Sequence, residues 1–156
     1  MATHVSFEGR SPVENILLLL ICLAIALHDV DGPIHCKSRQ KIRLQGIGAT
    51  ETDGTCRRGQ PCIAGDPFAQ RRVMARAMGA KLSREDLGRN GRPSRNGQAW
   101  FSQPVRLVCD VTGKSHERLT AWCKLPDGRD VSCAAIRAGV AVRWAKYDHG
   151  RRLESC

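Results

Sequence analysis

The stretch Arg43-Leu44-Gln45-Gly46-Ile47-Gly48-Ala49-Thr50-Glu51 joins a strand pattern to a polar loop. Apolar and polar side chains alternate through Arg43, as in a half-buried β-strand. The segment 30–46 therefore predicts two strands around a turn at 37–40. The following residues, 50–65, are rich in Gly, Pro, Thr and Asp and predict a loop.

The next segment predicts a helix. Asp66-Pro67 provides a cap followed by proline at the first helical position, and the helix should run to about Ala80. Apolar residues share one side of it, and its methionines are expected to fill the core. The arginines fall largely on other faces, where they either meet solvent or face phosphate. The solvated interpretation is preferred for Arg71, Arg72 and Arg76.

Residues 83–104 have no periodic pattern and are rich in Gly, Arg, Asn and Ser, which predicts an exposed basic loop insertion. Its arginines and the rings of Trp100 and Phe101 would suit phosphates and bases. The preferred alternative is a linker whose aromatic residues attach its end to the core. Strands at 105–111 and 119–125, a turn at 126–128 and a short helix ending at Gly139 should follow.

Length and net charge limit the number of domains and the kinds of partner that the chain can have. The chain has 156 residues, which is enough for one domain with a core. Twenty-five Lys and Arg against fifteen Asp and Glu give a formal net charge of +10. A polyanionic partner, either nucleic acid or an anionic membrane surface, fits this charge, although a basic surface also serves solubility alone.

Residues 16–27 form an apolar run that is short for a membrane span and typical of a signal-peptide core. Ala24-Ile25-Ala26 has the small-x-small pattern for cleavage, so residues 1–26 are interpreted as a leader and residues 27–156 as the mature domain. A secreted or periplasmic location follows. The alternative is a buried core segment, for which the preceding sequence offers no partner element.

Eight cysteines in so short a chain indicate disulfides, because no Cys-x-x-Cys pair is present. Cys56 and Cys62 enclose a short loop suited to a bridge. Removal of Cys22 with the leader would leave seven cysteines. The expected pairs are Cys56–Cys62, Cys109–Cys123 and Cys133–Cys156, with Cys36 left over.

Four pieces in order resemble the thermonuclease (staphylococcal-nuclease-like) family over about residues 29–147. They are Asp31-Gly32 followed by Arg43-Leu44, the block Ala49-Thr50-Glu51, the segment 117–121 beginning Glu117-Arg118, and Asp127-Gly128 with the segment 136–141. The resemblance implies an α+β, mainly β fold, a five-stranded OB-fold barrel with two to three packed helices. It also implies action on nucleic-acid phosphodiesters, with single strands favoured as partner.

The resemblance places the family's catalytic residues on Arg43, Glu51 and Arg118. The two arginines would stabilise charge on a five-coordinate phosphorus, and Glu51 would orient or deprotonate the attacking water. From local sequence alone, a structural Arg–Glu network is the alternative. His116-Glu117 departs from the family pattern before the second arginine, and His116 is interpreted as a surface histidine.

The family's calcium carboxylates are replaced by Pro33 and Gly48. Calcium is held by oxygen ligands and their charge, so no metal ligand and no cofactor are expected here. Three functions stay open at this point. They are a thermonuclease-like phosphodiester hydrolase, a non-catalytic OB-fold domain that binds nucleic acid or another anion, and a disulfide-stabilised envelope protein that makes protein contacts.

Overall fold

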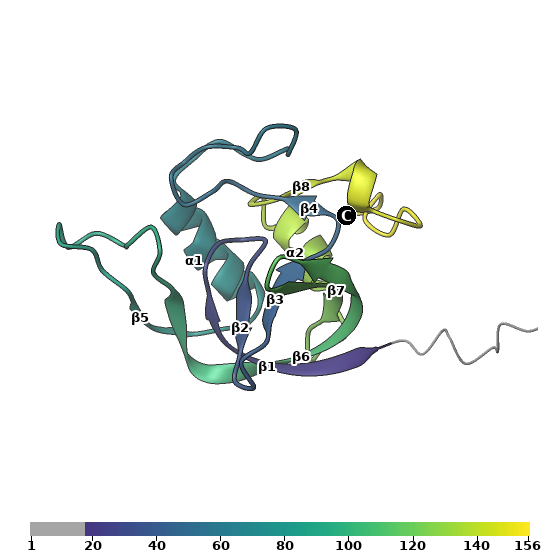
Figure 1. Ribbon diagram of the computed structural model, residues 1–156, viewed down its shortest axis with the longest axis horizontal. Helices are drawn as coiled ribbons and strands as arrows, with labels where there is room; N and C mark the ends of the chain where they lie inside the picture. Colours follow the sequence, from purple (N-terminus) through teal and green to yellow (C-terminus); the bar gives the residue numbers. More distant parts are fainter. Residues whose placement is uncertain (1–17) are drawn as a thin grey trace, which may run out of the picture.

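The computed structural model describes residues 18–156, and most of its regular structure is β-strand (Figure 1). In chain order the elements are β1 (Leu19–Leu27), β2 (Ile34–Cys36), β3 (Lys41–Leu44), β4 (Ile47–Gly48), α1 (Pro67–Ala77), β5 (Leu82–Glu85), β6 (Ala99–Ser115), β7 (Arg118–Lys124), α2 (Val131–Arg137), β8 (Val142–Arg143) and the 3₁₀ turn η2 (Ala145–Tyr147).

Five of these strands close into a barrel. Their order is β1-β2-β3-β7-β6, and β6 pairs back onto β1. The pairing of β3 with β7 is parallel, whereas the other barrel pairs are antiparallel. A five-stranded barrel with this mixed order, carrying two α-helices, is the expected OB-fold-like α+β class. The short strands β4 and β8 pair separately, and β5 pairs with the first part of β6 outside the ring.

Within the apolar run assigned to a leader, residues Leu19–Leu27 form β1. Its inward side chains include Cys22 and Ala24, which are buried, whereas Leu19, Ile21 and Leu23 point outward and are exposed. This alternation is that of a strand, and β2 and β6 are the partners that the sequence did not reveal. Cleavage before Leu27 would remove this barrel strand. Positions 1–17 of the expected leader lie outside the described residues.

All eight cysteines lie in the described part of the chain and form four disulfides. The three expected pairings, Cys56–Cys62, Cys109–Cys123 and Cys133–Cys156, are confirmed. The expectation that Cys36 is left over is wrong. Cys36 lies on β2 with its Cα 5.1 Å from that of Cys22 on β1, and the two are bridged. Four disulfides are typical of proteins that fold in an oxidising compartment.

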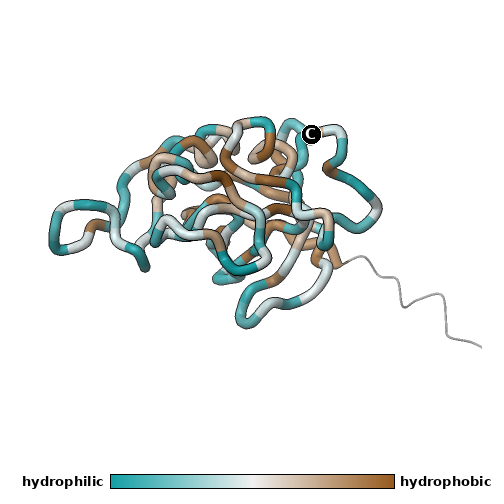
Figure 2. Tube along the Cα trace, turned by 90° about the horizontal axis from the view of Figure 1, so that it is seen from above, coloured by the Kyte–Doolittle hydropathy of each residue, from teal (hydrophilic) through white to brown (hydrophobic). Residues whose placement is uncertain are grey.

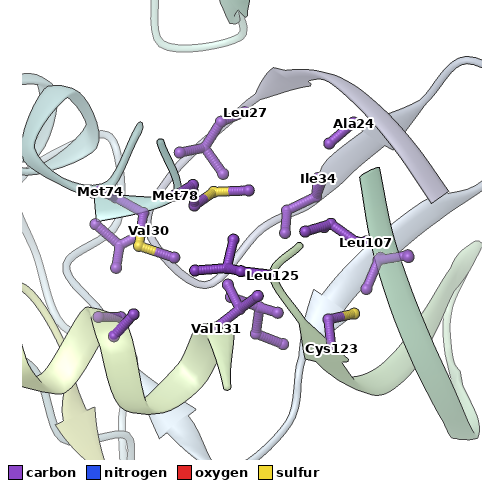
Figure 3. Close-up of a cluster of buried hydrophobic side chains, with 14 of the residues drawn as sticks. Ala24, Leu27, Val30, Ile34, Met74, Met78, Leu107, Cys123, Leu125 and Val131 are labelled. Carbon is purple, nitrogen blue, oxygen red and sulfur yellow. The ribbon is translucent and has the colours of Figure 1, made fainter. Parts of the chain in front are cut away.

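The core lies between the barrel and the two helices (Figure 3). Met74 of α1, Met78 at the C-cap of that helix and Val131 of α2 cluster with Leu27 and Leu125, and all five side chains are buried. The methionines therefore fill the core, as the sequence indicated. Hydrophobic residues concentrate in the centre of the trace, whereas the projecting loops are largely hydrophilic (Figure 2).

Helix α1 begins as expected, because the side chain of Asp66 accepts a hydrogen bond from the Phe68 amide. It ends at Ala77, three residues earlier than expected. The solvated interpretation of Arg71 is wrong, since this side chain is only 1% exposed. Its guanidinium donates to the carbonyl oxygen of His28 at 3.1 Å and pairs with Glu85 at 3.1 Å, which joins the end of β1 to β5.

The basic insertion is an ordered arm, residues 82–101, that projects from the barrel at the left of Figure 1. Its ends pair as strands β5 and β6, so the irregular part is shorter than the expected 83–104. Trp100 donates to Asp86 at 3.0 Å, and the Arg84 guanidinium lies 4.8 Å from its ring centre. Phe101 is buried. Phe101 belongs to the buried core and so attaches the end of the arm, as the preferred alternative held, whereas these side-chain contacts of Trp100 lie within the arm.

Among residues 18–156, every helix is too short or too polar to cross a membrane.

Two partly buried histidines, His28 and His35, lie near the base of the arm. Burial and the charge of Lys41 lower the pKa of His35. Burial and the charge of Arg71 lower the pKa of His28, against the opposing effects of its hydrogen bond with the Gly97 carbonyl and of Asp31. A lowered histidine pKa contributes stability that is fully present above the unfolded value of about 6.5. That contribution is lost as pH falls below it, because the unfolded chain binds the proton more tightly.

We expect His35→Gln to reduce the loss of unfolding free energy between pH 7.5 and pH 5, measured by urea titration at each pH. His149→Gln, at an exposed histidine, is the matched control and should keep the wild-type pH dependence. An equal loss in wild type and His35→Gln would contradict this explanation.

Candidate functional site

A cavity of about 530 Å³ opens on one side of the barrel. It is lined by residues from β3, the loop before α1, the β6–β7 hairpin and the C-terminal segment. These residues are Arg43, Gln45, Arg57, Arg58, Gln60, Thr112, Lys114, Ser115, Arg118, Thr120, Trp144, Tyr147 and His149. Five of them are Lys or Arg, and in the described chain no Asp or Glu lines the cavity. This surface is suited to an anion.

Arg43 is held in a fixed orientation at the cavity. Its Nη2 lies 2.9 Å from Oδ2 of Asp31, and its Nη1 donates to the carbonyl oxygen of Leu44 at 3.0 Å. The guanidinium also lies 5.9 Å from the ring centre of Trp144, which is within cation–π range. The side chain is 15% exposed. These contacts leave little rotamer freedom to lose when a ligand binds.

The parallel pairing of β3 and β7 brings Arg118 to the same cavity as Arg43. In that register Arg43 is opposite Thr120, and Arg118 precedes Thr120 by two residues on the same strand. Residues two apart on a strand face the same side, and both Arg118 and Thr120 line the cavity. Arg118 takes part in none of the ion pairs within residues 18–156. Its charge is therefore available to an anionic ligand.

Glu51 lies beside the cavity and is absent from its lining. Its Oε1 is 3.1 Å from Nε of Arg57, which does line the cavity, and its side chain is 23% exposed. Burial raises the pKa of Glu51, and the negative charge of Asp31 raises it further, against the opposing effect of Arg57. A raised pKa makes this carboxylate a better proton acceptor. The structure thus brings Arg43 and Arg118 together and places Glu51 at the edge.

Asp31, which contacts the cavity residues Arg43 and Gln60, has a second buried carboxyl group beside it, that of Asp29. Asp29 and Asp31 are each 4% exposed, and Asp29 accepts a hydrogen bond from the Gly32 amide. Burial, followed by the charge of Asp31, raises the pKa of Asp29 well above its usual range. Burial thus disfavours the charged form of Asp29, next to the ion pair of Asp31 and Arg43.

Gly48, one of the two positions where the resemblance expects a calcium carboxylate, is crowded by the loop that follows. A Cβ on Gly48 would collide with the carbonyl oxygen of Pro61 and come within 3.0 Å of Cγ of Gln60. Gln60 Nε2 donates to Asp31 Oδ2 at 3.0 Å, the same oxygen that Arg43 contacts. Two protein donors thus share one oxygen of the Asp31 carboxylate. Within residues 18–156, no three His, Cys, Asp or Glu side chains form a group suited to a metal ion.

Most residues of the cavity lining carry no signal in the sequence. Arg57, Arg58 and Gln60 lie in the loop closed by the Cys56–Cys62 disulfide, and the correctly expected bridge was the one available signal for them. Trp144 and His149 come from the C-terminal segment, where no sequence pattern indicated a site. His116, interpreted as a surface residue, is exposed and does not line the cavity.

The cavity combines guanidinium groups with two aromatic rings, and a carboxylate lies at its edge. Comparison of the chain with protein-family models, curated proteins and solved structures finds no match. Guanidinium groups offer paired donors that match phosphoryl oxygens, and Trp144 and Tyr147 form an edge-to-face pair with ring centres 4.5 Å apart. The arrangement can hold an anion with an attached planar group.

The close packing of the Pro61 backbone against Gly48 can be tested by adding a single methyl group at residue 48. Gly48→Ala should destabilise the fold by about 1–3 kcal/mol, because the Pro61 backbone must move to accept it. Urea unfolding measures the change. Gly88→Ala is the matched control, since its Cβ would meet its nearest neighbour, Asn90 Oδ1, at 3.4 Å. Equal stability of both variants would show that the loop yields freely at Gly48.

Proposed function

We propose that the chain is an exported thermonuclease-like protein that acts on nucleic-acid phosphodiesters at this cavity. The proposal rests on one observation: Arg43 and Arg118, from parallel strands, line the same cavity. Among the described residues, no carboxylate lines it. Glu51 at the edge supports it, because its raised pKa suits proton transfer. The four disulfides support export to an oxidising compartment.

In the proposed reaction Arg43 and Arg118 hold the non-bridging oxygens of one phosphodiester. Glu51 takes a proton from a water molecule as the water oxygen attacks phosphorus. The bond to the leaving sugar oxygen then breaks, and that oxygen takes a proton from solvent. The guanidinium groups stabilise the extra negative charge of the five-coordinate state. No step is assigned to a metal ion, since the positions of Pro33 and Gly48 offer it no carboxylate.

The aromatic pair favours a single-stranded substrate, either DNA or RNA. Trp144 and Tyr147 line the cavity that also holds the arginines. A base can stack on such rings only when it is free of its neighbours in a duplex, and stacking of this kind tolerates any base. A polynucleotide would therefore place a phosphate on the guanidinium groups and an unstacked base on the aromatic wall.

One observation favours a second function, binding without cleavage. Glu51 is paired with Arg57 at 3.1 Å, so its carboxylate is partly neutralised in the free protein. A base held in this way accepts a proton from water less readily unless the ligand displaces Arg57. The alternative is a non-catalytic OB-fold domain that binds nucleic acid or another anion at the same cavity.

Cleavage of a labelled single-stranded oligonucleotide by oxidised protein, with calcium and with chelator, separates the two functions. We expect turnover in chelator that Glu51→Gln lowers at least about 100-fold with little change in Kd. Arg43→Ala and Arg118→Ala should lower turnover about 100-fold or more and also weaken binding. Arg137→Ala, which removes one exposed arginine outside the cavity, is the charge-matched control.

Binding without turnover in wild type would support the non-catalytic function. Turnover that requires calcium would show that a metal site exists despite the contacts of Asp31 and Gln60. If wild type neither binds nor cuts at low salt, nucleic acid is not the partner.

A further inference from the structure

The loop closed by Cys56–Cys62 adds two cations to the cavity. Arg57 and Arg58 both line it, and neither belongs to the set that the resemblance indicated. The loop is short and is held at its base by the disulfide. Inside it, the Gln60 amide donates to the carbonyl oxygen of Arg57 at 2.9 Å, which forms a tight turn. The loop therefore presents both arginines from a restrained backbone.

One carboxylate oxygen fixes this loop relative to Arg43. Asp31 Oδ2 lies 2.9 Å from Arg43 Nη2 and accepts a hydrogen bond from Gln60 Nε2 at 3.0 Å. Gln60 is 6% exposed and Asp31 is 4% exposed, so this junction is shielded from water. Arg58 is two residues from Gln60. Buried contacts thus fix the backbone of the loop at Gln60 relative to Arg43, and the exposed side chain of Arg58 extends from that backbone.

The positive charge around the cavity is larger than the single negative charge of one phosphodiester. Arg43 is paired with Asp31 and Arg57 with Glu51. Arg58, Lys114 and Arg118 take part in none of the ion pairs within the described residues 18–156. An internucleotide phosphate carries one negative charge, so a single phosphate would leave most of this positive charge uncompensated. A ligand with consecutive phosphates matches the cavity better.

We propose that the Cys56–Cys62 loop is a second phosphate site, in which Arg58 binds the phosphate next to the one held by Arg43 and Arg118. The inference rests on the proposed function and names its substrate class: polynucleotide segments with at least two consecutive phosphates. Arg58 is the better test residue of the two loop arginines, because Arg57 also contacts Glu51 and its removal changes that carboxylate as well.

The test compares two single-stranded probes in chelator, a thymidine dinucleotide with one phosphate and a thymidine octanucleotide. Kd is measured by calorimetry over a series of salt concentrations. Arg58→Ala should raise the octanucleotide Kd about tenfold, as expected for one lost contact to a charged group. It should also reduce the slope of log Kd against log salt by about 0.7. Its dinucleotide Kd should stay within about twofold of wild type.

Arg137→Ala controls for the loss of one positive charge and should change neither probe by more than about twofold. The second site is absent if the octanucleotide Kd of Arg58→Ala equals that of Arg137→Ala. It is also absent if Arg58→Ala raises the Kd of both probes by the same factor. Arg43→Ala and Arg118→Ala distinguish this failure from a broader one. If these two variants weaken octanucleotide binding while Arg58→Ala does not, only the proposal of a second site fails. Should wild type bind neither probe, the proposed function fails as well.

Discussion

The parallel pairing of β3 with β7 is the constraint on which both the barrel and the cavity depend. It joins the hairpin of β2 and β3 to that of β6 and β7, and the barrel then closes through β1 and β6. The same register brings Arg43 and Arg118, which are distant in sequence, to one cavity. A shift by one residue would turn one of these side chains to the opposite face. The register of β3 against β7 therefore determines which charged side chains line the cavity.

Asp31 links this pairing to the loops around it. One of its oxygens holds Arg43 and Gln60, and its charge contributes to the raised pKa of Asp29 and of Glu51. A buried carboxylate is costly unless its lone pairs are satisfied, and here guanidinium and amide donors satisfy one oxygen. The charge of Asp31 is thus compensated by side chains of the protein. The cavity depends on this network for its geometry.

Much of the fold follows from local signals. The alternation through Ile42 and Leu44, the Asp66 cap and the small Cys56–Cys62 loop each depend on neighbours in sequence, and each is present in the structure. Strand β1 was missed because its outward side chains are also apolar, so the run has no polar alternation and resembles a leader. Its partner β2 follows closely, but the longer pairing is with β6, far along the chain.

The remaining misses involve side chains whose environment is set by distant segments. Arg71 lies on a helix where pattern analysis predicts solvent, yet the carbonyl oxygen of His28 and the carboxylate of Glu85 bury and satisfy it. Arg43 and Arg118 were found through ordered motifs, whereas Arg58 and Trp144 have no such local mark. Which charged residues share a cavity depends on long-range packing.

The central claim is that Arg43 and Arg118 together hold one phosphate without a metal ion. A crystal structure of the oxidised protein with a single-stranded phosphorothioate oligonucleotide, grown in chelator, tests it most directly. We predict one phosphate group within hydrogen-bond distance of both guanidinium groups, with a base against Trp144 or Tyr147. An oligonucleotide bound only along the arm at 82–101, with the cavity free of phosphate, would contradict it.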